Sequence, residues 1–177
     1  MDYPKIENYE IIKKIGEGNT GDVFIAKNSE NGKLYAIKAI SKNHQNISEI
    51  IKHYQLNKFS FIKYEEDKES EDYYFKVMEY FSGGSLFSIV NLCKSQNRFP
   101  IHEKYAAHIL IQLMKQVIEL EKNNIDYSYI KLSNLLVNFR SFEDFDNLNL
   151  GNLEIKLQIK QRKQNGKKTT SYLIYSI

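Results

Sequence analysis

The sequence predicts an α+β protein in which a five-stranded antiparallel sheet with one helix precedes a mainly helical part. Three observations support this fold class. Apolar and polar residues alternate over residues 9–40, as they do in half-buried strands. Apolar residues at helical spacing follow Asn46 and, later, Ser85. Between the strand-rich and the helix-rich parts lies the breaker pair Gly83-Gly84.

Residues 9–40 are expected to form three antiparallel strands, because turn residues at Glu17-Gly18 and at 28–33 interrupt the alternation. The helix that begins at Asn46 carries apolar residues at i, i+3, i+4 and i+7, namely Ile47, Ile50, Ile51 and Tyr54. One face of this helix should therefore pack against the sheet.

The last two strands of the sheet are expected at residues 59–64 and 73–80, which are rich in aromatic and β-branched residues. Residues 65–72 between them are mostly charged, so we expect a loop there.

The second part should contain two helices and a C-terminal β-hairpin. Ser85 is a suitable N-cap for a helix that buries Leu86, Ile89, Val90 and Cys93. A longer helix begins near Pro100, with one apolar stripe formed by Ala106, Ile109, Leu110, Leu113, Val117 and Leu120. A strand is expected from Leu135. The hairpin pairs residues 153–164 with residues 167–177 around Asn165-Gly166, and it should turn Ile155, Leu157 and Ile159 inward.

Composition indicates a cytoplasmic globular protein. The chain has 177 residues and a net charge of +3, with a single cysteine, Cys93, which excludes an intramolecular disulfide. No apolar run is long enough to span a membrane. Residues 151–177 hold six Lys/Arg and one Glu, which we interpret as a solvated hairpin whose lysines discourage edge pairing. We favour this interpretation over a nucleic-acid or membrane partner.

A glycine-rich hairpin followed by a strand lysine is the most informative pattern in the chain. The sequence I-G-E-G-N-T-G-D-V ends at Val23, and Y-A-I-K ends at Lys38. Glycines without a β-carbon let the backbone fold tightly and bring its N–H groups close to phosphate oxygens, which is the expected role of Gly16, Gly18 and Gly21. The flanking segments alternate like strands, so we favour a hairpin over the strand–loop–helix of a dinucleotide-binding fold.

Over Tyr9 to Val137 the chain resembles the eukaryotic protein kinase family, most closely its Ser/Thr branch. The motifs that carry the resemblance are, in order, the glycine hairpin, A-I-K at Lys38, a helix with Glu49, V-M-E-Y-x-x-G-G-S-L from Val77, and a catalytic-loop remnant before Asn134. The resemblance implies a two-lobe fold with an N-lobe at residues 1–80, a hinge at 81–84, a partial C-lobe at 85–152 and the hairpin at 153–177.

The resemblance also implies an ATP site. Ile15, Val23, Ala36 and Leu136 should enclose the adenine. Met78 is expected as gatekeeper and Glu79 to Phe81 as the hinge that hydrogen-bonds the purine. Lys38 should contact the phosphates and pair with Glu49. However, Asn46 and Glu49 also have the spacing of a capping box, so two readings of Glu49 stay open, of which we favour the ion pair.

The catalytic loop departs from the family pattern H-R-D-L-K-x-x-N. Aligned on Asn134, the chain places Tyr129 at the catalytic aspartate and Ser128 at the arginine, while Lys131 is retained as a phosphate contact. A phenol with a pKa near ~10 is a poor proton acceptor at neutral pH. Asp126 lies three positions upstream, too far to substitute without shifting the loop.

The metal site departs as well. If the strand that starts at Leu153 precedes D-F-G, the motif falls on Ile159-Lys160-Gln161, without a carboxylate. Asp144-Phe145-Asp146 is the one similar string, but it comes early in the chain for that role. We therefore expect Asn134 to be the remaining metal ligand and magnesium binding to be weak or absent. No A-P-E motif follows.

These departures lead us to expect a truncated, pseudokinase-like protein that binds ATP and has a regulatory role. One alternative is an active Ser/Thr kinase with an unusual base and metal ligand. Another is an interaction module or a truncated gene product that binds no nucleotide. Whichever of these functions holds, the partial C-lobe should leave the long helix incompletely covered, so a protein partner or self-association is expected there.

Overall fold

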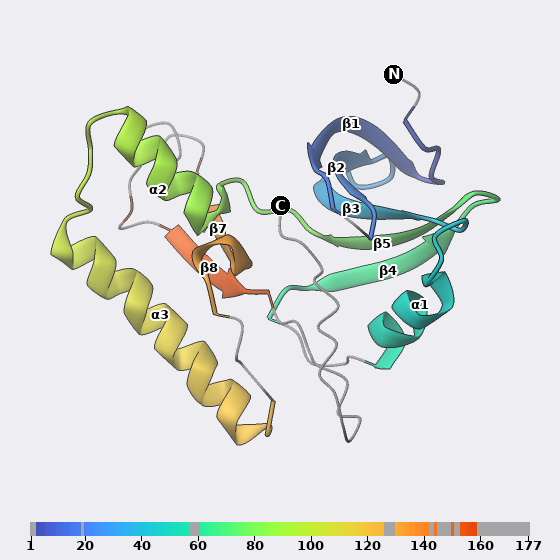
Figure 1. Cartoon of the computed structure of the whole chain (residues 1–177). Helices are drawn as coiled ribbons and strands as arrows, with labels where there is room; N and C mark the ends of the chain where they lie inside the picture. Colours follow the sequence, from blue (N-terminus) through green and yellow to red (C-terminus); the bar gives the residue numbers. More distant parts are fainter. Residues whose placement is uncertain are drawn as a thin grey trace. The chain divides into compact units, whose positions relative to one another are not determined.

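The computed structural model describes residues 3–18, 20–56, 61–125, 130–141, 144, 150 and 153–158, with the backbone alone for residues 53–56. The described residues divide into two compact units, one up to Tyr80 and one from Phe81 (Figure 1). In the described part of the chain, no helix is long and apolar enough to cross a membrane.

The first unit is a five-stranded antiparallel sheet with one helix, which confirms the predicted fold. Its strands follow the spatial order β1-β2-β3-β5-β4. The elements are β1 (Tyr9–Gly16), β2 (Asp22–Asn28), β3 (Leu34–Ser41), α1 (Ile47–Leu56), β4 (Tyr64–Glu69) and β5 (Tyr73–Glu79). Four of these strands, β1, β2, β3 and β5, and the helix lie where the sequence predicted them.

One face of this sheet forms the core of the unit. Phe24, Ile37 and Val77 are opposite one another on β2, β3 and β5, so their side chains point to the same face, and all three are buried. Full burial of each such side chain stabilises the fold by about 1.5–3 kcal/mol. The cluster also includes Tyr9, Ala26, Ala39 and Phe75.

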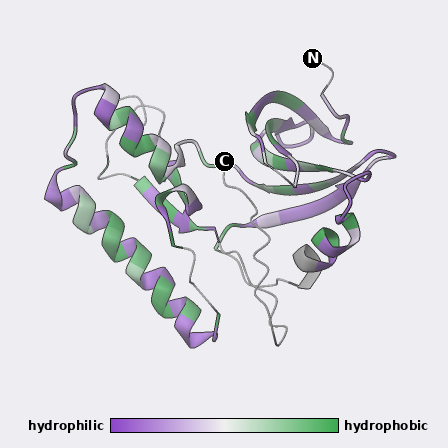
Figure 2. Ribbon diagram, viewed as in Figure 1, coloured by the Kyte–Doolittle hydropathy of each residue, from purple (hydrophilic) through white to green (hydrophobic). Residues whose placement is uncertain are grey.

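The fourth strand is not where the sequence predicted it. We expected a strand at residues 59–64 and a charged loop at 65–72, whereas β4 spans Tyr64–Glu69 and pairs with β5. Residues 57–60 lie outside the described part of the chain. β4 is an edge strand that is held by backbone pairing, so its side chains are mostly exposed and hydrophilic (Figure 2). Charged residues on an exposed edge limit pairing with other chains, which explains the misleading composition.

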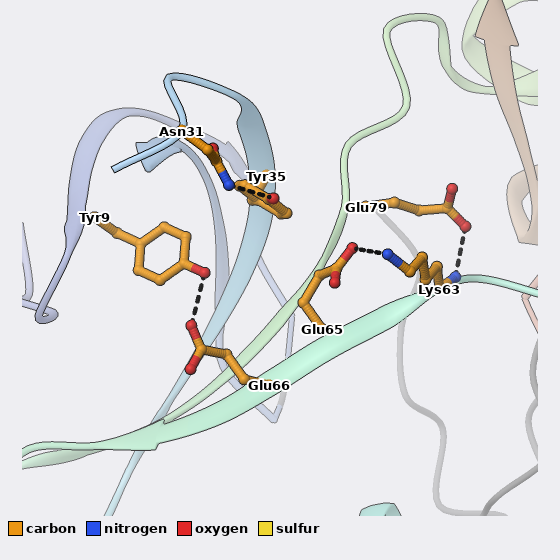
Figure 3. A network of polar contacts seen from close by, with 7 residues as sticks. All are labelled: Tyr9, Asn31, Tyr35, Lys63, Glu65, Glu66 and Glu79. Atoms are coloured by element: carbon orange, nitrogen blue, oxygen red, sulfur yellow. Dashed lines mark hydrogen bonds and ion pairs between the residues drawn. The ribbon is translucent and has the colours of Figure 1, made fainter. Parts of the chain in front are cut away.

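The two edge strands of the sheet are joined by side chains. The Tyr9 hydroxyl on β1 donates a hydrogen bond of 2.8 Å to Glu66 Oε1 on β4 (Figure 3). A second pair, between Lys63 and Glu65 at 2.7 Å, stays within the β4 region and does not link the two edges. Because β1 and β4 are at opposite ends of the strand order, the Tyr9–Glu66 bond requires the sheet to curl around its core.

The second unit combines two helices with a three-stranded antiparallel sheet of order β6-β7-β8. Its elements are β6 (Gly84–Ser85), α2 (Leu86–Ser95), α3 (Glu103–Lys122), the 3-10 turn η1 (Leu132–Asn134), β7 (Leu135–Phe139) and β8 (Leu153–Leu157). Ser85 caps α2 as predicted, because its hydroxyl accepts a 3.2 Å hydrogen bond from the Ser88 N–H.

The long helix α3 is less apolar on its packed side than the sequence predicted. Of the expected stripe, Leu120 is buried and Ile109, Leu113 and Val117 are half-buried, but Ala106 and Leu110 are exposed. The side of α3 that contacts β8 carries glutamines, which form hydrogen bonds with the backbone of β8.

Gln112 and Gln116 bind the outer edge of β8 as a neighbouring strand would. Gln112 accepts from the Ile155 N–H at 3.0 Å and donates to the Leu153 carbonyl at 3.1 Å. Gln116 accepts from the Leu157 N–H at 2.7 Å and donates to the Ile155 carbonyl at 2.9 Å. The edge of β8 is thus satisfied by side-chain amides of α3.

The predicted C-terminal hairpin lies only partly within the described residues. β8 covers the start of its first strand, and Ile155 and Leu157 are buried as predicted. Ile159 and the second strand at 167–177 lie outside the described residues.

Candidate functional site

The glycine hairpin joins β1 to β2 and lies against β3. Gly21 has φ +138°, and a β-carbon there would be 2.2 Å from the Ala39 carbonyl oxygen. Its N–H donates to the Gly18 carbonyl at 3.1 Å. Position 21 therefore requires glycine for both its backbone conformation and its space.

Four of the predicted site residues share one face of the sheet, opposite the core cluster. Val23 is opposite Lys38 on the neighbouring strand, and Ala36 is opposite Met78. Since Ala36 and Lys38 are two residues apart, all four side chains point to the same face. Each is buried. This face combines an apolar wall with the strand lysine Lys38, as a nucleotide-binding surface requires.

The Lys38 ammonium is bonded to the glycine hairpin. Lys38 is only 7 % exposed, and its Nζ donates a hydrogen bond of 2.6 Å to Thr20 Oγ1. The sequence analysis did not single out Thr20. The available signal was its position, since it is the one hydroxyl residue between Gly16 and Gly21.

A second buried lysine faces Lys38 across β3 and β5. Lys76 is directly opposite Lys38, so the two cations share the same sheet face. Lys76 Nζ lies 3.4 Å from Asp67 Oδ1 and 4.3 Å from the centre of the Tyr64 ring. The carboxylate and the aromatic face offset the charge of Lys76. The sequence analysis did not single out Lys76, because only the pairing of β3 with β5 places it opposite Lys38.

Ile15 and Gly16 lie at the end of β1, where Gly16 is opposite Val23. Glu49 lies in the first turn of α1 with an exposed side chain. Its ion pair with Lys38 stays a prediction, as does the capping alternative.

The predicted hinge and the floor of the adenine site divide between the two units. Glu79 ends β5 in the first unit. Phe81 and Leu136 are buried in the second unit, where the Lys156 ammonium lies 5.8 Å from the Phe81 ring centre. The adenine site that combines them with Val23 and Ala36 stays a prediction.

Asn134 is the most buried polar residue of the predicted site. It closes η1, where its N–H donates to the Lys131 carbonyl at 2.8 Å. Its own carbonyl accepts from the Gln158 N–H at 2.7 Å, which ties the end of β8 to η1. Lys131 is exposed. Asp126, Ser128 and Tyr129 lie outside the described residues, so the substitution at the catalytic position stays a prediction.

The two candidate metal motifs lie on either side of β8. Asp144 is in the connection between β7 and β8, where its Oδ2 accepts a 2.9 Å hydrogen bond from Ser141 Oγ. The rest of this motif, Phe145 and Asp146, lies outside the described residues. So do residues 159–161, the other candidate motif, which come shortly after β8 in the sequence. Within the described residues, no group of three or more His, Cys, Asp or Glu side chains could hold a metal ion.

Comparison with known sequences identifies one family. The model of the protein kinase domain matches residues 9–172. Calcium-dependent protein kinase 4 of Plasmodium berghei (strain Anka) is 32 % identical over 146 residues, which are 78 % of this chain and 27 % of the relative. The probable serine/threonine-protein kinase pkgA of Dictyostelium discoideum is 31 % identical over 143 residues, 76 % of this chain and 10 % of the relative. The chain thus spans about a quarter of the length of the first relative and less of the second.

A solved structure has the same fold. The crystal structure of Rad53 residues 1–466 in complex with AMP-PNP matches with a TM-score of 0.59 at 22 % identity, over 85 % of this chain and 38 % of that one. This likeness concerns the fold, which agrees with the sheet-plus-helix unit and the helical unit described above. Since the family model covers most of the chain and the relatives are named as protein kinases, the chain belongs to the protein kinase family.

Proposed function

We propose that the chain binds ATP through the sheet face of the first unit. The observation that carries the proposal is the buried Lys38, which lies beside the glycine hairpin and on the same face as Val23, Ala36 and Met78. The lysine would attract the phosphates, and hairpin N–H groups would donate to them. The apolar residues would hold the purine.

We further infer that phosphotransfer is impaired and that the protein has a regulatory role. The support is in the sequence, where Tyr129 aligns with the catalytic aspartate and Ile159-Lys160-Gln161 with D-F-G. Kinases of this family use ATP with magnesium, and Asn134 is the remaining residue here that aligns with a metal ligand. One amide oxygen supplies too few ligands for a tight magnesium site. We therefore expect ATP binding that depends weakly on magnesium.

A second candidate function is active Ser/Thr protein phosphorylation. It is favoured by relatives such as pkgA, which is named as a probable serine/threonine-protein kinase. In this case Asp144 or Asp146 would supply the metal carboxylate.

Titration with ATP, followed by the melting temperature, tests nucleotide binding. A ligand that binds only the folded state raises the free energy of unfolding by RT ln(1 + [L]/Kd). We expect stabilisation with or without magnesium, reduced in Lys38→Met. Lys27→Met removes an exposed lysine of the same sheet and serves as a matched control. The absence of any shift at millimolar ATP in the wild type would contradict nucleotide binding.

Transfer of radiolabelled phosphate to a generic protein substrate separates the two candidate functions. We expect transfer at background level, and no rescue by Tyr129→Asp. Loss of a general base costs ~10²- to 10⁴-fold, and the missing metal carboxylate is a separate loss. Robust transfer that Lys38→Met abolishes would support the active kinase instead.

A further inference from the structure

We propose that Thr20 lowers the affinity for ATP by competing with phosphate for the Lys38 ammonium. The inference rests on the proposed nucleotide binding and identifies a residue that sets its strength. It concerns only the first unit, in which the hairpin, β2 and β3 form one sheet.

The contact itself is short and shielded. Lys38 Nζ lies 2.6 Å from Thr20 Oγ1, and because an ammonium can only donate, the hydroxyl oxygen is the acceptor. Lys38 is 7 % exposed. A charge-assisted hydrogen bond in such a place is stronger than one at the surface, because water competes poorly for it.

The backbone of the hairpin explains why Thr20 reaches the lysine. The Gly21 N–H bond to the Gly18 carbonyl closes a tight turn around position 20. Gly21 lies so close to Ala39, the neighbour of Lys38 on β3, that no β-carbon fits between them. Thr20 is therefore held over the part of β3 that carries the lysine.

Phosphate would bind the same ammonium. We infer that an ATP phosphate oxygen displaces Thr20 Oγ1 from the buried Lys38 ammonium, and that Thr20 then moves away from the lysine. In the closed arrangement Thr20 is bonded to Lys38, and in the open arrangement it is not. If ATP binds only the open arrangement, its apparent affinity is the intrinsic affinity multiplied by the fraction of molecules that are open. Removal of the hydroxyl should remove this penalty while leaving the apolar wall unchanged.

The opposite role is chemically possible and predicts the opposite sign. A hydroxyl that accepts from Lys38 still has its own hydrogen, which it could donate to a phosphate oxygen. In that case Thr20 would strengthen ATP binding. The effect of one isosteric substitution therefore decides between competition and assistance.

The experiment measures the Kd of ATP and of adenosine by calorimetry for the wild type, Thr20→Val and Thr20→Ser. Valine has the shape of threonine without the hydroxyl, and serine retains the hydroxyl. We expect Thr20→Val to bind ATP roughly three- to tenfold more tightly, from the typical net value of a hydrogen bond. Thr20→Ser should keep the wild-type affinity. Adenosine, which has no phosphates, should bind all three proteins equally, and in a Lys38→Met background Thr20→Val should have no effect on ATP.

The melting temperature without ligand separates competition from a purely structural role. Thr20→Val should lower it slightly, since a folded-state hydrogen bond is lost, while ATP affinity rises. Equal or weaker ATP binding by Thr20→Val would overturn the inference and leave the proposed nucleotide binding intact. If neither protein binds ATP, the proposed function fails, and the inference fails with it.

Discussion

Two buried lysines face each other on β3 and β5, and each has a polar partner. Lys38 is bonded to Thr20, and Lys76 pairs with Asp67 under the Tyr64 ring. Like charges that are directly opposite in a sheet repel each other. The partners therefore make this arrangement possible in a folded protein.

Loss of the Asp67 carboxylate alone should destabilise the folded protein more than loss of both charges of the Lys76–Asp67 pair. We expect Asp67→Asn to lower the free energy of unfolding by about 1 kcal/mol, because Lys76 is buried and Asp67 is partly exposed. The double variant Lys76→Met/Asp67→Asn should recover part of the loss. Urea denaturation measures both, and an Asp67→Asn variant as stable as the wild type would contradict this.

Tyr9 should make the fold sensitive to alkaline pH. Burial, followed by the hydrogen bond to Glu66, raises the pKa of Tyr9 to about 12. In the unfolded chain the pKa of Tyr9 is near 10. Between pH 10 and 12 the Tyr9 hydroxyl therefore keeps its proton in the folded state and loses it in the unfolded state. Stability from this group is complete below pH ~10 and falls as the pH rises toward 12.

Comparison of the wild type with Tyr9→Phe isolates that contribution. At pH 8 the variant should be less stable by about 1 kcal/mol, since the Glu66 bond is lost. Between pH 10 and 12 the difference should shrink, because only the wild type loses the stability that Tyr9 supplies. Chemical denaturation across this range measures it. A difference that stays constant would mean that Tyr9 titrates normally.

Cys93 should be unreactive in the folded protein. It is buried on α2, and burial raises the pKa of its thiol. The thiolate is the reactive form, so both effects slow modification. We expect an aromatic disulfide reagent at pH 8 to react slowly with the native chain and rapidly after addition of urea. Immediate reaction of the native protein would show that α2 opens readily.

Among the elements, α3 and β8 are joined in an unusual way. Gln112 and Gln116 are four residues apart, so their side chains lie on one face of the helix. They occupy both hydrogen-bonding groups of Ile155, together with the Leu153 carbonyl and the Leu157 N–H. The helix thus replaces a fourth strand at the edge of the small sheet.

This arrangement predicts a clear difference between neighbouring positions of α3. We expect Gln116→Ala to lower the free energy of unfolding by about 1–3 kcal/mol, because two backbone groups of β8 lose their partners. Lys115→Ala, at the exposed adjacent position, should change it by less than about 0.5 kcal/mol. Thermal denaturation checks both. Equal effects would mean that water replaces the glutamine without cost.

For the whole molecule, the exposed side of α3 suggests an association surface. Leu110, Ile111, Met114 and Ile118 are between 46 % and 56 % exposed and lie along one face of the helix. We propose that this face mediates association with another copy of the chain. A contiguous apolar surface of this kind is typical of interaction sites.

Light scattering of the purified chain tests the association. We expect species larger than the monomer, reduced by Met114→Glu, which places a charge in the middle of the apolar face. Gln96→Glu adds the same charge at the exposed C-cap position directly after α2 and should leave the association unchanged. A stable monomer that binds no hydrophobic dye would contradict the proposal.

The sequence alone determined the five-stranded sheet, the cap of α2, the glycine hairpin and the order of the family motifs. These features depend on local spacing, since alternation, capping and glycine positions act over a few residues. The strand predicted from the sequence at residues 59–64 was wrong, and β4 lies at Tyr64–Glu69 instead, because backbone pairing at an edge strand does not require apolar side chains.

Only the tertiary structure decided which distant side chains meet. Thr20 and Lys38 are 18 residues apart, Gln116 and Leu157 41, and Tyr9 and Glu66 57. The contacts depend on strand register, on the packing of α3 against β8 and on the curl of the sheet, and none of these can be read from the residues that make the bond. The sequence therefore predicts the lysine of the candidate site, whereas the folded sheet determines which group holds that lysine.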